Sequence, residues 1–112
     1  MEANEAFVES VRGALRSLYD PAGLRSHPLL VQFRLSERDN PALALRDTLT
    51  RAVEAMRPSD DVPEDAHAWR YYEVLLYRYI QQCGQQEVAD QLGLGVRHVR
   101  REERAALEVL AG

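Results

Sequence analysis

The chain has 112 residues, 46% hydrophobic and 29% charged, which is an ordinary composition for one globular domain. Its single cysteine, Cys83, excludes an internal disulfide bond and any metal site built from several cysteines. The formal net charge is -4 at pH 7 and all fourteen basic residues are arginines. A domain that binds nucleic acid usually carries a basic excess, so any basic surface here must be local.

The sequence gives no sign of export or membrane insertion. It contains no run of about eighteen apolar residues. The amino terminus reads Met-Glu-Ala-Asn-Glu, which is acidic where a secretory signal would be basic. We therefore expect a cytoplasmic protein that contacts no membrane.

Two amphipathic helices are predicted in the first half of the chain. Apolar residues recur in steps of three and four over residues 2–19 and again over residues 41–57. The dipeptide Asn40-Pro41 marks the start of the second helix, because asparagine accepts hydrogen bonds from free amides and proline suits the first helical position. The dipeptide Arg57-Pro58 is expected to end it.

Shorter segments separate these helices. Residues 20–25 are predicted to form a loop because they contain proline and glycine. Ser26 is expected to cap a brief apolar helix over residues 27–33, although a buried strand fits the same pattern. Residues 58–65 are acidic and bounded by prolines, so they are interpreted as a solvated linker that caps the next helix, with a carboxylate cluster for a cation as the alternative.

The most apolar helix is predicted over residues 66–82. A helix that is apolar on nearly all sides belongs in the middle of the molecule, and Gly84 is expected to end it. Stacking of its tyrosines on nucleic-acid bases is an alternative. However, aromatic residues at helical spacing beside leucines more often belong to the core.

A short helix over residues 85–92 and a longer one from Val96 onward complete the chain. Ala89 is small enough to let two crossing helices approach closely, and Gly93 suits the left-handed residue that ends the first helix. The apolar side of the second helix contains Val96, Val99, Ala106, Leu107 and Leu110. The basic side contains Arg97, Arg100, Arg101 and Arg104.

This arrangement resembles the helix-turn-helix superfamily, and more narrowly region four of bacterial sigma factors and related regulators. The matching residues are Glu87, Val88, Ala89, Leu92, Gly93, Leu94, Val99 and Arg101. Two positions differ from the family pattern. Gly95 stands where a serine or threonine usually caps the second helix. Glu102 stands where many members have an apolar residue, which suggests a solvated face or a pair with an arginine.

The resemblance implies binding of double-stranded DNA. It assigns Val96, Arg97, Arg100 and Arg101 to the surface that meets base edges, where the arginine fork matches the two acceptors of guanine. Arg104, together with Gln85 and Gln86, would lie near phosphates. The function expected is therefore that of a bacterial transcriptional regulator, or of the DNA-binding module of a larger one.

A second interpretation is a protein-interaction adaptor that keeps the helix-turn-helix as a scaffold without touching DNA. From Gly84 to Gly112, four arginines face five acids, giving a net charge of -1. The arginines would then form a solvated face paired with acids. These acids are Glu87, Asp90, Glu102, Glu103 and Glu108. A protein partner or a homodimer would use the amino-terminal bundle.

The fold class expected is all-α, with about six helices in a single domain. Residues 1–64 would form an amino-terminal helical bundle, and residues 65–112 the central helix and the carboxyl-terminal helix-turn-helix. We expect no enzyme, cofactor or metal site, because His27, His67 and His98 lie far apart in the sequence and no catalytic motif is present.

Overall fold

The computed structural model describes residues 4–112, which form seven α-helices and one π-helical segment, η1, with no strand in that range. The elements are α1 (Glu5–Arg16), α2 (Pro21–Arg25), α3 (Leu29–Gln32), α4 (Pro41–Glu54), α5 (His67–Leu75), η1 (Leu76–Ile80), α6 (Gln85–Leu92) and α7 (Val96–Ala111). The predicted all-α fold class is confirmed. None of the helices in the described range has both the length and the apolar character needed to cross a membrane.

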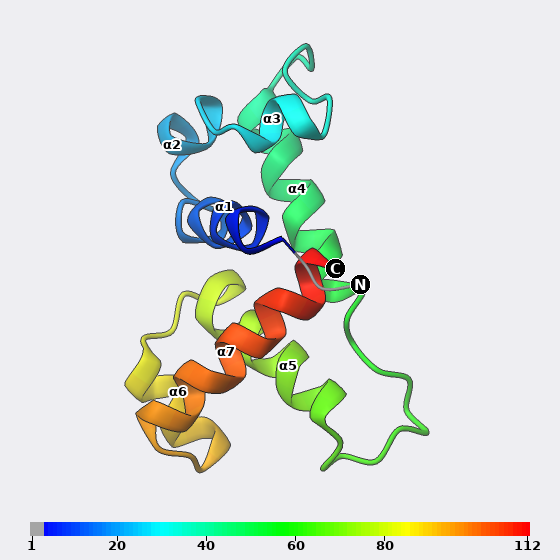
Figure 1. The fold of residues 1–112 in the computed structure, drawn as a ribbon, viewed down its shortest axis with the longest axis vertical. Coiled ribbons are helices and arrows are strands. Elements are labelled where there is room, and N and C mark those ends of the chain that lie inside the picture. The colour runs from blue at the N-terminus through cyan, green and yellow to red at the C-terminus, as the bar shows by residue number, and fades with distance from the viewer. Residues whose placement is uncertain (1–3) are drawn as a thin grey trace.

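The helices fall into two groups along the long axis of the molecule, which measures 42 × 28 × 26 Å (Figure 1). Helices α1 to α4 lie at one end and α5 to α7 at the other. Helix α7 reaches from the second group to the first, where it packs against α1. It also packs along α5, so α5 and α7 together hold the two groups in contact.

Two hydrophobic cores of unequal size result. The larger core contains apolar side chains of α1 to α4 together with Leu75, Tyr79, Ala106 and Leu107, so it crosses the boundary at residue 64. The smaller core has four fully buried members at the other end of the molecule. These are Val74, Val88, Ala89 and Val99. Cys83 is half-buried against the smaller core, as expected of a small apolar residue.

The predicted starts of α1 and α4 depend on asparagine caps. The Asn40 side chain accepts a hydrogen bond from the Leu43 amide at 3.2 Å and Pro41 takes the first helical position, which confirms this prediction. Asn4 likewise accepts from the Ala6 amide at 2.8 Å. The predicted start of the first helix at Glu2 lies outside the described residues.

Both long helices of the first half end earlier than predicted. Helix α1 stops at Arg16 rather than Tyr19, and α4 stops at Glu54 rather than Arg57. After α4, the Arg57 amide bonds to the Glu54 carbonyl at 3.1 Å, in a three-residue step that tightens the final turn. The last turn before Pro58 therefore has three-residue hydrogen bonds, and the α-helix proper ends ahead of it.

The loop predicted over residues 20–25 is wrong, because Pro21–Arg25 forms the helix α2. Pro21 stands at the first helical position, where its fixed φ favours the helix. Gly23 is needed for close approach, since a Cβ there would lie 2.8 Å from Asp20 Oδ2 and 3.1 Å from Ser17 Oγ. Proline and glycine in this segment therefore mark a tightly packed helical turn.

The predicted cap of the next helix is also wrong. Ser26 ends α2, and the His27 ring caps α3 instead, with its Nδ1 accepting from the Leu29 amide at 3.2 Å. Burial of the ring lowers the pKa of His27, which favours the neutral form that can accept a hydrogen bond at this nitrogen. The brief helix itself is confirmed, over the shorter range of α3.

The central helix ends before Gln82 and changes type on the way. After α5 the chain continues as η1, where the Gln81 amide bonds to the Leu76 carbonyl at 2.9 Å, one residue beyond an α-helical step. Gln82 then adopts a left-handed φ of 58°. Gly84 was predicted to end this helix, and that prediction is wrong. It stands before the first residue of α6 with an ordinary φ of -70°.

Two side-chain hydrogen bonds hold the chain at the end of η1 and in the turn that follows it. The Tyr19 hydroxyl donates to the Ile80 carbonyl at 2.8 Å. Arg78 Nη1 donates to the Cys83 carbonyl at 3.0 Å, which closes the turn that leads into α6. The bond from Tyr19 satisfies a carbonyl that the helix end leaves free, and the bond from Arg78 fixes the turn after it.

Candidate functional site

A three-residue connection joins α6 to α7. Gly93 ends α6 with a left-handed φ of 67°, as predicted, and the Leu94 amide bonds back to the Ala89 carbonyl at 2.9 Å. Ala89 is fully buried, so its small side chain allows the close approach of α6 to the rest of the smaller core. At the other end of α6, the Glu87 carboxylate accepts from the Gly84 amide at 3.0 Å. Gly95 begins α7 without a side-chain cap.

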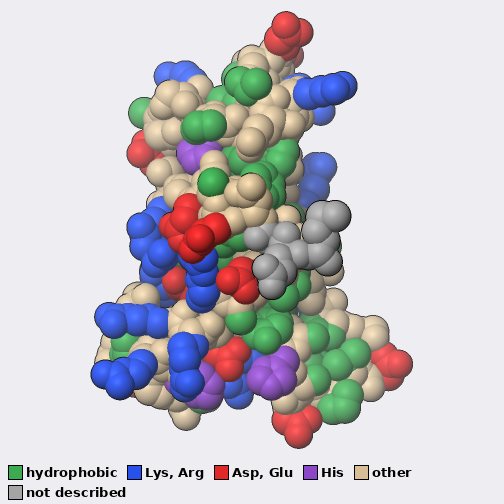
Figure 2. Space-filling model, in the orientation of Figure 1, with side chains coloured by type: hydrophobic (Ala, Val, Ile, Leu, Met, Phe, Trp, Pro, Cys, Tyr) green, Lys and Arg blue, Asp and Glu red, His purple; other side chains and the backbone are tan. Residues whose placement is uncertain are grey.

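Three arginines are exposed on the first two turns of α7. We call Arg97, Arg100 and Arg101 the arginine face. Figure 2 shows that basic side chains gather over α6 and the first half of α7. Among residues 4–112, no carboxylate lies within 4.0 Å of these three guanidinium groups. The face therefore keeps its positive charge.

The two glutamates that follow point inward, which corrects the expectation of a solvated face or a pair with an arginine at Glu102. Glu102 is 8% exposed and its Oε1 lies 3.0 Å from His98 Nε2. Glu103 is 3% exposed and pairs with Arg78 at 2.8 Å and Arg12 at 3.8 Å. Neither glutamate neutralises the arginine face.

Arg104 differs from the other arginines of α7. It pairs with Glu9 and with Glu5, at 3.2 Å, from α1, and with Glu108 of its own helix at 3.4 Å. The hydrogen bond with Glu9 is the main cause that raises the pKa of Arg104. These three carboxylates offset the charge of Arg104. The phosphate contact expected of this residue stays a prediction.

The remaining predicted site residues lie beside the arginine face. Gln85 is half-buried and accepts from Arg100 Nε at 3.1 Å, so it orients that arginine. Gln86 is exposed and donates to the Asp90 carboxylate at 3.0 Å. Val96 was expected both on the apolar side and at the base-contacting surface, and it is half-buried against the smaller core.

Two hollows that the sequence did not predict lie beside the arginine face. One, of about 210 Å³, brings together two histidines that lie far apart in the sequence. Its lining residues are His67, Tyr71, His98, Arg101, Glu102 and Ala105. The other, of about 160 Å³, gathers three arginines from two helices. Its lining residues are Arg12, Gln85, Arg100, Glu103, Arg104 and Leu107. Only the four-residue step from His98 to Glu102 gave a local signal for either one.

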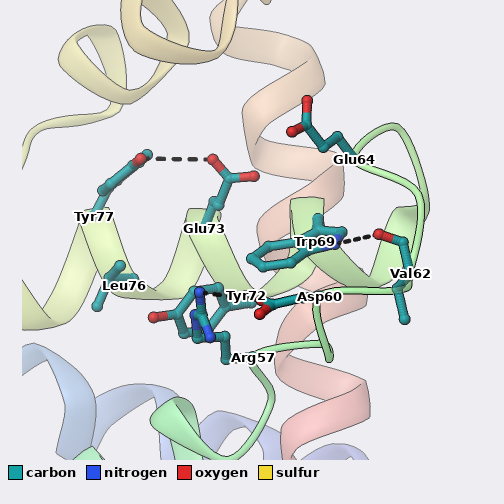
Figure 3. Close-up of a pocket in the computed structure, with 9 residues that line it drawn as sticks. All are labelled: Arg57, Asp60, Val62, Glu64, Trp69, Tyr72, Glu73, Leu76 and Tyr77. Atoms are coloured by element: carbon teal, nitrogen blue, oxygen red, sulfur yellow. Dashed lines mark hydrogen bonds and ion pairs between the residues drawn. The ribbon is translucent and has the colours of Figure 1, made fainter.

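A third and larger hollow lies away from the arginine face, between the acidic loop and α5. We call this hollow, of about 650 Å³, the aromatic pocket (Figure 3). Its lining residues are Arg57, Asp60, Val62, Glu64, Trp69, Tyr72, Glu73, Leu76 and Tyr77. Trp69 and Tyr72 are half-buried and line this pocket, whereas Val74 and Leu75 of the same helix are fully buried.

The described residues hold no group of three histidine, cysteine, aspartate or glutamate side chains that could bind a metal ion. A scan of protein-family models, a search of curated proteins and a search of solved structures each found no match to this chain. The evidence for function is therefore the arginine face and the pockets described above.

Proposed function

We propose that α6 and α7 form a helix-turn-helix that binds double-stranded DNA, in a bacterial transcriptional regulator or in the DNA-binding module of a larger one. The observation that carries the proposal is the arginine face. Three guanidinium groups point to solvent from one helix, free of carboxylate partners among residues 4–112, while the acids that follow them are buried.

The spacing of the arginine face suits a helix that lies in the major groove. Arg97, Arg100 and Arg101 follow one another in steps of three and one, so they project from neighbouring positions on one side of α7. A guanidinium donates two parallel hydrogen bonds to the O6 and N7 atoms of guanine. Gln85 and Gln86, at the start of α6, would contact phosphates.

The support beneath α7 is rigid enough for such a role. Val99, Ala106 and Leu107 are buried along its inner side, and Glu103 ties it to two arginines of other elements. The helix has 16 residues and is therefore about 24 Å long. With three arginines of α7 free of carboxylate partners in the described part of the chain, we expect an isolated chain to bind duplex DNA with a Kd on the order of micromolar at low salt.

The test is binding of the purified chain to mixed-sequence duplex DNA at low and moderate salt. The variant Arg97→Ala/Arg101→Ala should bind at least about tenfold more weakly, because each arginine contact contributes about 1–3 kcal/mol. The control is Arg25→Ala/Arg51→Ala, which removes two exposed arginines from other helices and changes the net charge equally. Equal losses in both variants, or no binding by the wild type at low salt, would reject the proposal.

The adaptor function remains the second candidate, favoured by one observation. The pairs of Arg104 with Glu5 and Glu9 leave α7 with three arginines that have no carboxylate partner among the described residues, within a chain whose net charge is -4. In that case the wild type would bind no DNA. Sedimentation would instead detect a dimer or a complex with a protein that contacts α1 to α4.

A further inference from the structure

The aromatic pocket has a rigid indole at its centre. Trp69 Nε1 donates to the Val62 carbonyl at 3.1 Å, and the Tyr72 ring meets the indole edge-on, with centroids 6.2 Å apart and planes at 71°. A hydrogen bond on one edge and an aromatic ring beside it fix the orientation of the indole. Leu76 and Tyr77, about two turns after Trp69, extend the wall of the pocket.

The indole already holds a cation of this chain. The Arg57 guanidinium carbon lies 5.4 Å from the Trp69 ring centroid, which is within the range of a cation–π contact. Arg57 also pairs with Asp60 at 3.8 Å. The pocket is therefore built from groups that accept a guanidinium, and its own basic residue has a carboxylate partner.

Two further carboxylates in the pocket have no basic partner among the described residues. Asp60, Glu64 and Glu73 against the single Arg57 give the lining a charge of -2. Figure 3 shows Glu64 and Glu73 on one side of Trp69, and Arg57 with Asp60 on the other. The Glu73 carboxylate accepts from the Tyr77 hydroxyl at 3.5 Å. This arrangement leaves negative charge beside an aromatic wall.

We propose that the aromatic pocket binds a small organic cation, with a guanidinium or ammonium head on a short alkyl chain. The head would lie between Glu64 and Glu73, and the alkyl chain would cover Trp69 and Leu76. Charge complementarity favours such a ligand over an anion or a neutral molecule of equal size, and the apolar surface of Trp69 and Leu76 suits its alkyl chain. A volume of about 650 Å³ is within the usual range for small-molecule sites. The proposal is independent of DNA binding.

The test uses the only tryptophan of the chain as its reporter. Butylguanidine, titrated into the purified protein, should change the fluorescence of Trp69 in a saturable way. Butylurea, a neutral molecule of nearly the same shape, should not. Saturation by both compounds alike, or by neither, would overturn the proposal.

Variants distinguish binding of butylguanidine in this pocket from its general electrostatic attraction to an acidic protein. Glu64→Gln/Glu73→Gln should weaken butylguanidine binding at least about tenfold, because each carboxylate would form a charge-assisted hydrogen bond with the guanidinium. Glu37→Gln/Glu54→Gln removes two exposed carboxylates elsewhere and should leave the affinity unchanged. Far-UV circular dichroism verifies that each variant is folded. Equal affinity in the two double variants would contradict the proposal.

An arginine-bearing peptide, capped at both ends, tests a protein source of the same head group. Binding of butylguanidine with an affinity equal to or greater than that of the peptide supports the small-molecule site. Binding of the peptide at least tenfold more tightly, with the same dependence on Glu64 and Glu73, would assign the pocket to a basic protein segment and overturn the small-molecule proposal.

Discussion

Gly93 and Gly95 flank Leu94 in the connection between α6 and α7, but they differ in backbone conformation. Gly93 has a φ of 67°, whereas Gly95 has a φ of -79° that any residue adopts. A Cβ built on either glycine meets no atom within 4 Å. The two positions therefore differ in conformational strain and not in available space.

We expect Gly93→Ala to lower the free energy of unfolding by about 1–2 kcal/mol, because the left-handed region is unfavourable for a residue with a Cβ. Gly95→Ala should change it by less than about 0.5 kcal/mol. Urea unfolding of both variants measures the difference. If the two variants lose the same stability, the left-handed turn is not the cause.

Single residues were predictable where their role is local. The cap at Asn40 and the turn at Gly93 depend on neighbours within a few residues, and both predictions are confirmed. The burial of Glu102 and Glu103 was not predictable, because an acidic pair in an arginine-rich stretch usually faces water. Glu103 is buried because Arg78, 25 residues earlier in the chain, meets it.

At the scale of elements, Glu103 joins three helical segments. Its carboxylate belongs to α7, Arg78 to η1 and Arg12 to α1. Arg78 also lies over the Tyr79 ring at 5.4 Å, so the same contact region packs against the larger core. Burial, and secondarily the charge of Glu103, raises the pKa of the Tyr79 hydroxyl.

We expect Glu103→Ala to lower the free energy of unfolding by about 3 kcal/mol, since it leaves two partly buried guanidinium groups without their carboxylate. Glu108→Ala removes an exposed glutamate, also paired with an arginine, from the same helix and should have an effect below about 1 kcal/mol. Thermal and urea unfolding of the pair test this. A small effect of Glu103→Ala would mean that water replaces the carboxylate.

The π-helical segment was not predictable from hydrophobic periodicity. Four of the five residues in this segment are apolar or aromatic, namely Leu76, Tyr77, Tyr79 and Ile80. Their hydrophobic pattern therefore fits an α-helical and a π-helical hydrogen-bond step equally well. At the end of this segment the Ile80 carbonyl accepts from Tyr19, in the turn after α1, which is a long-range contact that periodicity does not reveal. The aromatic pocket was not predictable for the same reason. The sequence of a helix that is apolar on all sides does not reveal which side is buried.

At the scale of the whole molecule, the larger core makes the two groups of helices interdependent. Leu75, Tyr79, Ala106 and Leu107 are at most 4% exposed because α1 to α4 cover them. Residues 65–112 without this cover would expose all four side chains. The all-α class followed from periodicity alone, but this pairing of helices did not, because it depends on contacts between distant segments.

We therefore expect one cooperative unfolding transition. Trp69 fluorescence reports the surroundings of α5, and far-UV circular dichroism reports all helices. Their midpoints in urea should coincide within experimental error, as in other small single domains. Separate midpoints would show that the two groups of helices unfold independently.

The unequal size of the two cores has a consequence for native-state fluctuations. Helix α6 contributes two fully buried side chains, Val88 and Ala89, and the half-buried Leu92, all to the smaller core. Regions with few buried apolar contacts open with less free energy than the whole molecule does. We therefore expect α6 to open more readily than α1 and α4, so its amide protons should exchange with solvent faster than those of these two helices.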